Sequence, residues 1–240
     1  MRKQAPQTRI SDSEAWVTPF FGAASPLAQS AYDSPYSRLG APTPHPNDDP
    51  YVSLRSQALS TLEAMGYDPQ TMTERGVLWA EDQDPFGHVT QAKFMHFLGV
   101  GFHRTVESMG EFLSEQEYND MIHAKTVIPV LHKYELQIRK QVRYPDSLII
   151  ANRPECMEPT RYRLTSSLFS LRQQAIVAEV AAWVTFIDAA TGRPIDLRSL
   201  SGGWPRVYEG YVKKVEQAQA LREKWKKMKP SAITVVPSKI

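Results

Sequence analysis

The sequence contains a single cysteine, Cys156, so a disulfide within the chain is excluded. Structural disulfides are typical of oxidising compartments, and a lone cysteine therefore favours a reducing one. No apolar run approaches the roughly 20 residues that cross a bilayer, and no transmembrane segment is expected. The net charge is only +2, which argues against nucleic acid as a partner. No internal repeat is present, which argues against a solenoid.

The composition that remains is that of an ordinary globular protein with extensions. The 240 residues are 42% hydrophobic and 22% charged, which is enough for one sizeable core. Residues 12–50 contain seven prolines, which exclude a regular helix or a central strand and predict an extended arm. Residues 1–11 carry three basic residues and no acid. This pattern predicts a mitochondrial targeting segment, with a cytoplasmic location as the alternative.

Hydrophobic periodicity divides the rest of the chain. It predicts a packing helix over 51–66 that stops at Gly66, a strand over 71–80, and a long buried helix from Thr90 to about Leu113. Alternating patterns then predict strands over 133–139, 148–152, 161–168 and 176–187, joined by turns short enough for antiparallel pairing. We therefore expect an α+β architecture in which a five-stranded, mainly antiparallel sheet wraps one long helix. The predicted units are the arm (1–50), the packing helix (51–68), the main domain (70–200) and a basic helical extension (201–240).

The stretch of the chain with the most chemistry lies at the junction between the first strand and the long helix. Three carboxylates, Glu81, Asp82 and Asp84, precede a Pro-Phe-Gly turn, and the helix follows directly. A helix start offers unpaired backbone N–H donors and a partial positive charge. A carboxylate beside it can act as a base or as a nucleophile. A helix cap or a turn aspartate is the structural alternative for Asp84.

This junction resembles the signature of 4-hydroxybenzoyl-CoA thioesterase-like hotdog proteins. In that family a strand ends in Asp-x-Asp, followed by x-x-Gly-[His/Ile]-Val and the central helix. Here the corresponding residues are Asp82-Gln83-Asp84-Pro85-Phe86-Gly87-His88-Val89. The later Arg143-Tyr144-Pro145-Asp146-Ser147 resembles a strand-connecting turn of the family, and Thr191-Gly192-Arg193-Pro194 resembles its usual ending. The chain departs from the family at Thr90-Gln91, where many members have Asn-Asn.

The resemblance implies a hotdog fold and a thioesterase that acts on an acyl-CoA or an acyl-carrier protein. It implies a homodimer or higher homo-oligomer, a CoA thioester as substrate with no other cofactor, and no metal. Asp84 would be the general base or nucleophile, and the backbone N–H of Gln91 would face the thioester carbonyl. The wider site that we predict contains His88 as a catalytic candidate and, as substrate-binding candidates, Gly87, Phe86, Thr90 and Arg143.

Other interpretations stay open at this point. His88 can be purely structural at the helix start, and the fold can serve a non-catalytic binding subunit that grips a partner through its extensions. A hotdog enoyl-CoA hydratase is a third possibility, although one extra residue separates the acids from His88. His96 and His103 lack metal-ligand spacing. We expect Cys156, which follows a predicted Pro-Glu turn, to be a spectator.

Overall fold

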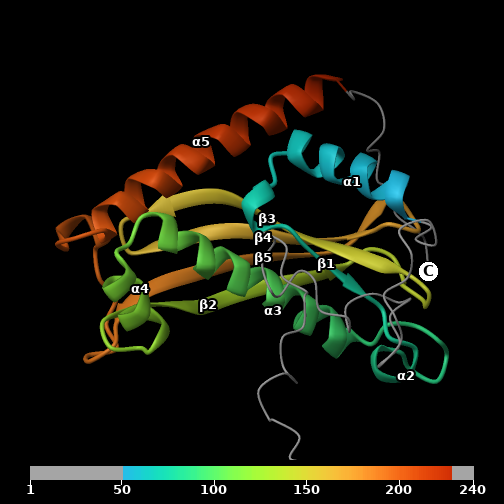
Figure 1. The fold of residues 1–240 in the computed structure, drawn as a ribbon, viewed down its shortest axis with the longest axis horizontal. Coiled ribbons are helices and arrows are strands. Elements are labelled where there is room, and N and C mark those ends of the chain that lie inside the picture. Colours follow the sequence, from blue (N-terminus) through green and yellow to red (C-terminus); the bar gives the residue numbers. More distant parts are fainter. Residues whose placement is uncertain (1–50, 229–240) are drawn as a thin grey trace, which may run out of the picture.

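The structure is a computed structural model that describes residues 51–228 (Figure 1). The predicted arm and the predicted targeting segment lie outside this range. The elements in chain order are α1 (Val52–Ala64), η3 (Pro69–Thr71), β1 (Thr73–Gly76), α2 (Trp79–Asp82), α3 (Gln91–Ser108), η4 (Met109–Glu111), α4 (Glu115–Ile122), β2 (Val127–Ile138), β3 (Ser147–Glu158), β4 (Arg161–Ser170), β5 (Ala175–Asp188), η5 (Leu197–Ser199) and α5 (Trp204–Met228). No helix within this range is long and apolar enough to cross a membrane.

The strands form one antiparallel sheet in the order β1-β3-β4-β5-β2, and α3 runs across one of its faces (Figure 1). The α+β prediction is therefore confirmed. One face of α3 is buried, chiefly through Phe94, Phe97 and Leu98. Gly101 lets the helix approach the sheet closely, because a Cβ at this position would lie 2.6 Å from Cγ2 of Ile150. A side chain there would push the helix away from β3.

The two faces of the sheet bury different clusters. Along β3, Leu148 and Ile150 point into the main core with α3, whereas Ile149 and Ala151 point into a second cluster beneath α1. This alternation follows from the period of two in a strand. The predicted helix over 51–66 is thus confirmed as a packing helix. Its chain turns at Gly66, which has a φ of +85°.

The C-terminal helix α5 begins in the main core and runs along β3. The indole of Trp204 packs 6.4 Å from the ring of Phe186, whereas Arg222 pairs with Glu155 on β3 at 3.1 Å. The strand β1 pairs only with the first four residues of β3. The rest of that β3 edge, which would otherwise be open, is flanked by α5 and by the η3 segment (Figure 1).

The structure corrects several sequence-based expectations, including the end of the long helix, which lies at Ser108 and not near Leu113. The first strand ends at Gly76, not Ala80, because the chain turns there into the short helix α2. The helix α4 was not expected, although its capping box of Ser114 and Glu117 is a recognisable start signal. Cys156 lies inside β3 at a bulge, not after a turn. Pro154 does not end that strand. It lies on the part of β3 that β1 leaves unpaired, where no neighbouring strand needs the backbone N–H that proline lacks.

Candidate active site

The segment between β1 and α3 folds back on itself as a tight loop. Gln83 and Val89 form an isolated antiparallel bridge, and the N–H of Asp84 donates to the carbonyl of His88 at 2.8 Å. Gly87 closes the turn with a φ of +77°, a conformation that side chains rarely adopt. The predicted turn glycine is therefore required by the backbone. The loop brings Asp84 and His88 together.

Asp84 stands at the head of this loop with its two carboxylate oxygens in different surroundings. Oδ1 accepts the backbone N–H groups of Phe86 and His88, both at 2.9 Å. These bonds, with the one from His88 first, lower the pKa of Asp84 below its usual value of 3.8. Oδ2 has no partner within residues 51–228. An ionised carboxylate is thus held by one oxygen while the other is available for chemistry.

The helix α3 starts immediately after this loop. Thr90 is its N-cap, but the hydroxyl of Thr90 makes no capping bond. The N–H of Thr90 donates to the carbonyl of Asp82 at 2.9 Å, and Gln91, the first helical residue, is exposed. The first backbone N–H groups of a helix have no partner inside it. This helix start therefore offers donors to a negatively charged group.

Asp82 has a structural position that the sequence did not determine. Its side chain is fully buried, and its Oδ2 accepts the N–H of Leu78 at 2.7 Å. Oδ1 lies 3.2 Å from Nζ of Lys93 in the first turn of α3, at an angle that makes an ion pair and not a hydrogen bond. Together with its carbonyl bond to Thr90, Asp82 ties both ends of the loop to α3.

The connection between β2 and β3 forms the other wall of the loop. Val142 accepts the N–H of Val89 at 2.9 Å, and the side-chain oxygen of Gln83 accepts the N–H of Tyr144 at 2.9 Å. Nη2 of Arg143 lies 2.5 Å from Nε2 of His88. The anchoring roles of Gln83 and Val142 were missed. No sequence pattern indicates them, because their partners lie more than 50 residues away in the chain.

Two aromatic side chains stand out from the surface beside Asp84. Phe86 is 79% exposed, and Trp79 is 67% exposed with its ring 5.7 Å from that of Tyr144 in an edge-on contact. Trp79 lies near the end of the strand predicted over 71–80, but in the structure it begins α2 and faces outward. Exposed aromatic rings of this size favour contact with a ligand or a partner.

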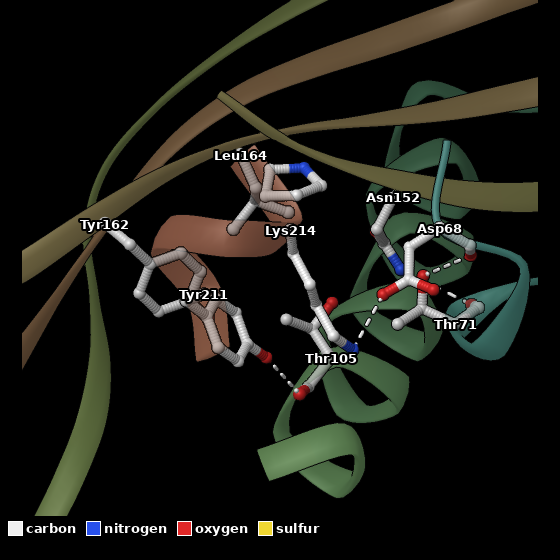
Figure 2. A pocket seen from close by; sticks show the side chains of 9 residues that line it. Asp68, Thr71, Thr105, Asn152, Tyr162, Leu164, Tyr211 and Lys214 are labelled. Carbon is white, nitrogen blue, oxygen red and sulfur yellow. Dashed lines mark hydrogen bonds and ion pairs between the residues drawn. The ribbon is translucent and has the colours of Figure 1, made fainter. Parts of the chain in front are cut away.

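A second polar region lies between α3, β3, β4 and α5 (Figure 2). Its cavity, of about 10 Å³, has room for about one water molecule. Lys214 closes one side through a 3.0 Å ion pair with Asp68, and the hydroxyl of Tyr211 donates to the carbonyl of Thr105 at 3.0 Å. Burial raises the pKa of the Tyr162 hydroxyl, which has no hydrogen-bond partner among residues 51–228. The cavity is too small for a substrate, so the candidate active site remains the Asp84 loop.

Nothing in residues 51–228 gathers three or more of the side chains that hold metals. His96 and His103 lie on α3 and belong to no such cluster within this range.

Comparison with known proteins returned a likeness in structure alone. No protein-family model matches the sequence, and no curated protein matches it. A Staphylococcus aureus protein whose structure was determined in complex with CoA is 13% identical, with a TM-score of 0.50 over 62% of this chain and 84% of its own. A DHNA-CoA thioesterase from the same organism is 16% identical, with a TM-score of 0.47 over 64% and 93% of the two chains. A 1,4-dihydroxy-2-naphthoyl-CoA thioesterase from Synechocystis is 14% identical, with a TM-score of 0.48 over 60% and 96%.

The first of these likenesses, together with the sheet order and the central α3, decides the fold. The chain has the hotdog fold. This confirms the fold that the Asp-x-Asp and Gly-His-Val residues implied. In this hotdog chain the Asp84 loop lies between the first strand and the central helix, as the resemblance predicted.

Proposed function

We propose that the protein is a thioesterase that hydrolyses an acyl-CoA or an acyl-carrier-protein thioester. The observation that carries this proposal is the state of Asp84, an ionised carboxylate with one oxygen tethered and the other unpartnered at the start of α3. Two of the similar structures are thioesterases, and a third was determined in complex with CoA. These likenesses support thioester hydrolysis as the proposed reaction.

In the proposed reaction, negative charge develops on the carbonyl oxygen of the thioester. The N–H of Gln91 at the start of α3 stabilises this charge, and losing one such donor typically costs about 3–4 kcal/mol of barrier. Phe86, Gly87 and Thr90 contact the acyl or pantetheine part of the substrate. The C–S bond then breaks, and the thiolate leaves without needing a strong acid.

Asp84 acts either as a general base or as a nucleophile, and only the second route forms a covalent acyl-enzyme intermediate. As a general base it takes a proton from water, and the resulting hydroxide adds to the carbonyl carbon. As a nucleophile its free oxygen attacks the carbonyl, and water then hydrolyses the mixed anhydride. Mass spectrometry of acid-quenched enzyme separates the routes, because only the second adds the mass of the acyl group to the peptide that contains Asp84.

We also propose that two copies join along β2, so that each active-site loop lies beside the partner. The strand β2 is an outer strand of the sheet, and four of its apolar side chains are between 37% and 51% exposed. These are Val130, Leu131, Tyr134 and Ile138. An edge strand of 12 residues with exposed apolar side chains is an unfavourable surface to leave in water. Pairing with a second copy would satisfy both its backbone and its side chains.

The test of the proposed function is thiol release from a chain-length series of acyl-CoAs. Asp84→Asn should lower kcat/KM by at least about 100-fold, the usual contribution of a positioned base or nucleophile. Asp188→Asn is the matched control, because Asp188 also accepts backbone N–H bonds in a turn and also has a lowered pKa, but lies at the end of β5.

Because the pKa of Asp84 is lowered, the carboxylate stays ionised as pH rises above its usual value of 3.8. The wild-type rate should therefore not change with Asp84 ionisation between about pH 5 and pH 8. An unchanged rate in Asp84→Asn would refute the role of this residue. Absence of hydrolysis with every thioester would favour the non-catalytic binding subunit.

A further inference from the structure

The contact between Arg143 and His88 determines which ring nitrogen of His88 carries a proton. Nη2 of Arg143 lies 2.5 Å from Nε2 of His88. A guanidinium group has only donors and keeps its proton at any ordinary pH. Nε2 therefore has to accept this hydrogen bond through its lone pair. The imidazole is then neutral, and its single proton is on Nδ1.

The protonated ring nitrogen is the one that lies near the carboxylate. Nδ1 of His88 is 4.0 Å from Oδ1 of Asp84, the same oxygen that accepts two backbone N–H groups. The ring thus places a neutral N–H beside the tethered oxygen and leaves Oδ2 of Asp84 unpartnered. Asp84 from the same loop and Arg143 from the β2–β3 connection are the charged groups that contact His88 within residues 51–228.

We propose that Arg143 is a positioning residue that fixes His88 as the neutral Nδ1–H tautomer. The consequence for catalysis rests on the proposed function, but the tautomer does not. With Arg143 in place, a second proton on the ring would sit against a guanidinium. Without it, no guanidinium lies against Nε2, and that nitrogen is open to a second proton. A charged ring beside Asp84 would then compete with substrate for the carboxylate.

The direct test is nitrogen-15 NMR of the histidine rings in the full chain, with the His88 signals assigned by loss in His88→Gln. In the wild type at neutral pH, Nδ1 should carry the proton and Nε2 should not. In Arg143→Gln the His88 ring should change, either to the Nε2–H form or to the doubly protonated form as pH falls. Arg172→Gln is the matched control, because it removes the same charge from the neighbouring turn and should leave the His88 signals unchanged.

The pH dependence of activity provides a second test, because a purely structural role of Arg143 would not change it. For Arg143→Gln, kcat/KM should fall below that of the wild type as pH decreases from 8 to 6, by up to about tenfold per pH unit, which is the slope of a single titrating group. A wild-type His88 with its proton on Nε2, or a ring that is the same with and without Arg143, would overturn the proposal. If the tautomer is as expected but no thioester is hydrolysed, the inference stands and the proposed function fails.

Discussion

Replacing the buried Asp82 with alanine should loosen the active-site loop while leaving every proposed catalytic residue in the sequence. Four contacts meet at Asp82, and two of them use its side chain. These are the 2.7 Å bond from the N–H of Leu78 and the 3.2 Å ion pair with Lys93. The two backbone bonds, from the N–H of Thr90 to the Asp82 carbonyl and from the N–H of Asp82 to the Leu78 carbonyl, survive the substitution. The loop would then be attached to α3 on one side only.

The expected loss of stability follows from the two side-chain contacts. Leaving a buried N–H unsatisfied costs about 1–3 kcal/mol. Removing one partner of a fully buried ion pair costs about 3–5 kcal/mol, but the side chain of Lys93 is 29% exposed and can be rehydrated, so its share is well below that range. We therefore expect Asp82→Ala to lower the free energy of unfolding by roughly 2–4 kcal/mol. Asp82→Asn keeps an acceptor for Leu78 and should cost less.

Urea unfolding of the wild type, Asp82→Ala, Lys93→Met and the double variant tests this reasoning. The double-mutant cycle should give a coupling of about 0.5–3 kcal/mol, as for residues in direct contact. The activity of Asp82→Ala should fall at urea concentrations far below the unfolding midpoint, because the loop is displaced before the core opens. A loss under about 0.5 kcal/mol, the usual effect of a surface substitution, would show that Asp82 does not hold the loop.

Two further predictions use pairs of matched substitutions. Leu131→Lys on β2 should convert the proposed dimer into monomers in sedimentation experiments, whereas Leu221→Lys, on α5 and equally exposed at 42%, should not; a dimer that survives both would exclude β2 as the interface. Gly66→Ala and Gly192→Ala both strain a positive φ at a cost of about 1–2 kcal/mol, but a Cβ at Gly66 also meets the Ala218 carbonyl oxygen at 2.5 Å. Thermal unfolding should therefore show an extra loss of about 1–3 kcal/mol for Gly66→Ala, and equal losses would argue against tight packing between α1 and α5.

The parts of the fold that could be predicted from the sequence are those set by local patterns. The apolar period of α3 is a direct consequence of its one buried face. The alternation along β5 and the first half of β4 follows from side chains that point in turn to the two faces of the sheet. The helix α2 has only four residues, too few for a helical period, and its apolar residues therefore suggested a longer strand.

The candidate site also has a part that local sequence predicts and a part that depends on tertiary structure. Asp84, Gly87 and His88 are close in sequence, so a short motif could indicate them. The contact of His88 with Arg143 spans 55 residues, and that of Gln83 with Tyr144 spans 61. Such pairings depend on how the β2–β3 connection returns to the loop, which no local pattern in one sequence specifies. The burial of Asp82 is likewise a product of tertiary packing.

The C-terminal helix shows why the extension beyond the sheet belongs to the fold. An edge of a sheet has to be paired or covered, and β1 pairs with only residues 147–150 of β3. Beyond that point the chain supplies other cover, since the N–H of Asp68 donates to the carbonyl of Asn152 at 2.8 Å and Lys214 of α5 holds Asp68 by an ion pair. Val207 and Tyr211 of α5 are also buried in the same core as α3. A short β1 leaves the loop before α3 free to carry Asp84, and α5 replaces the cover that a longer β1 would have given to β3.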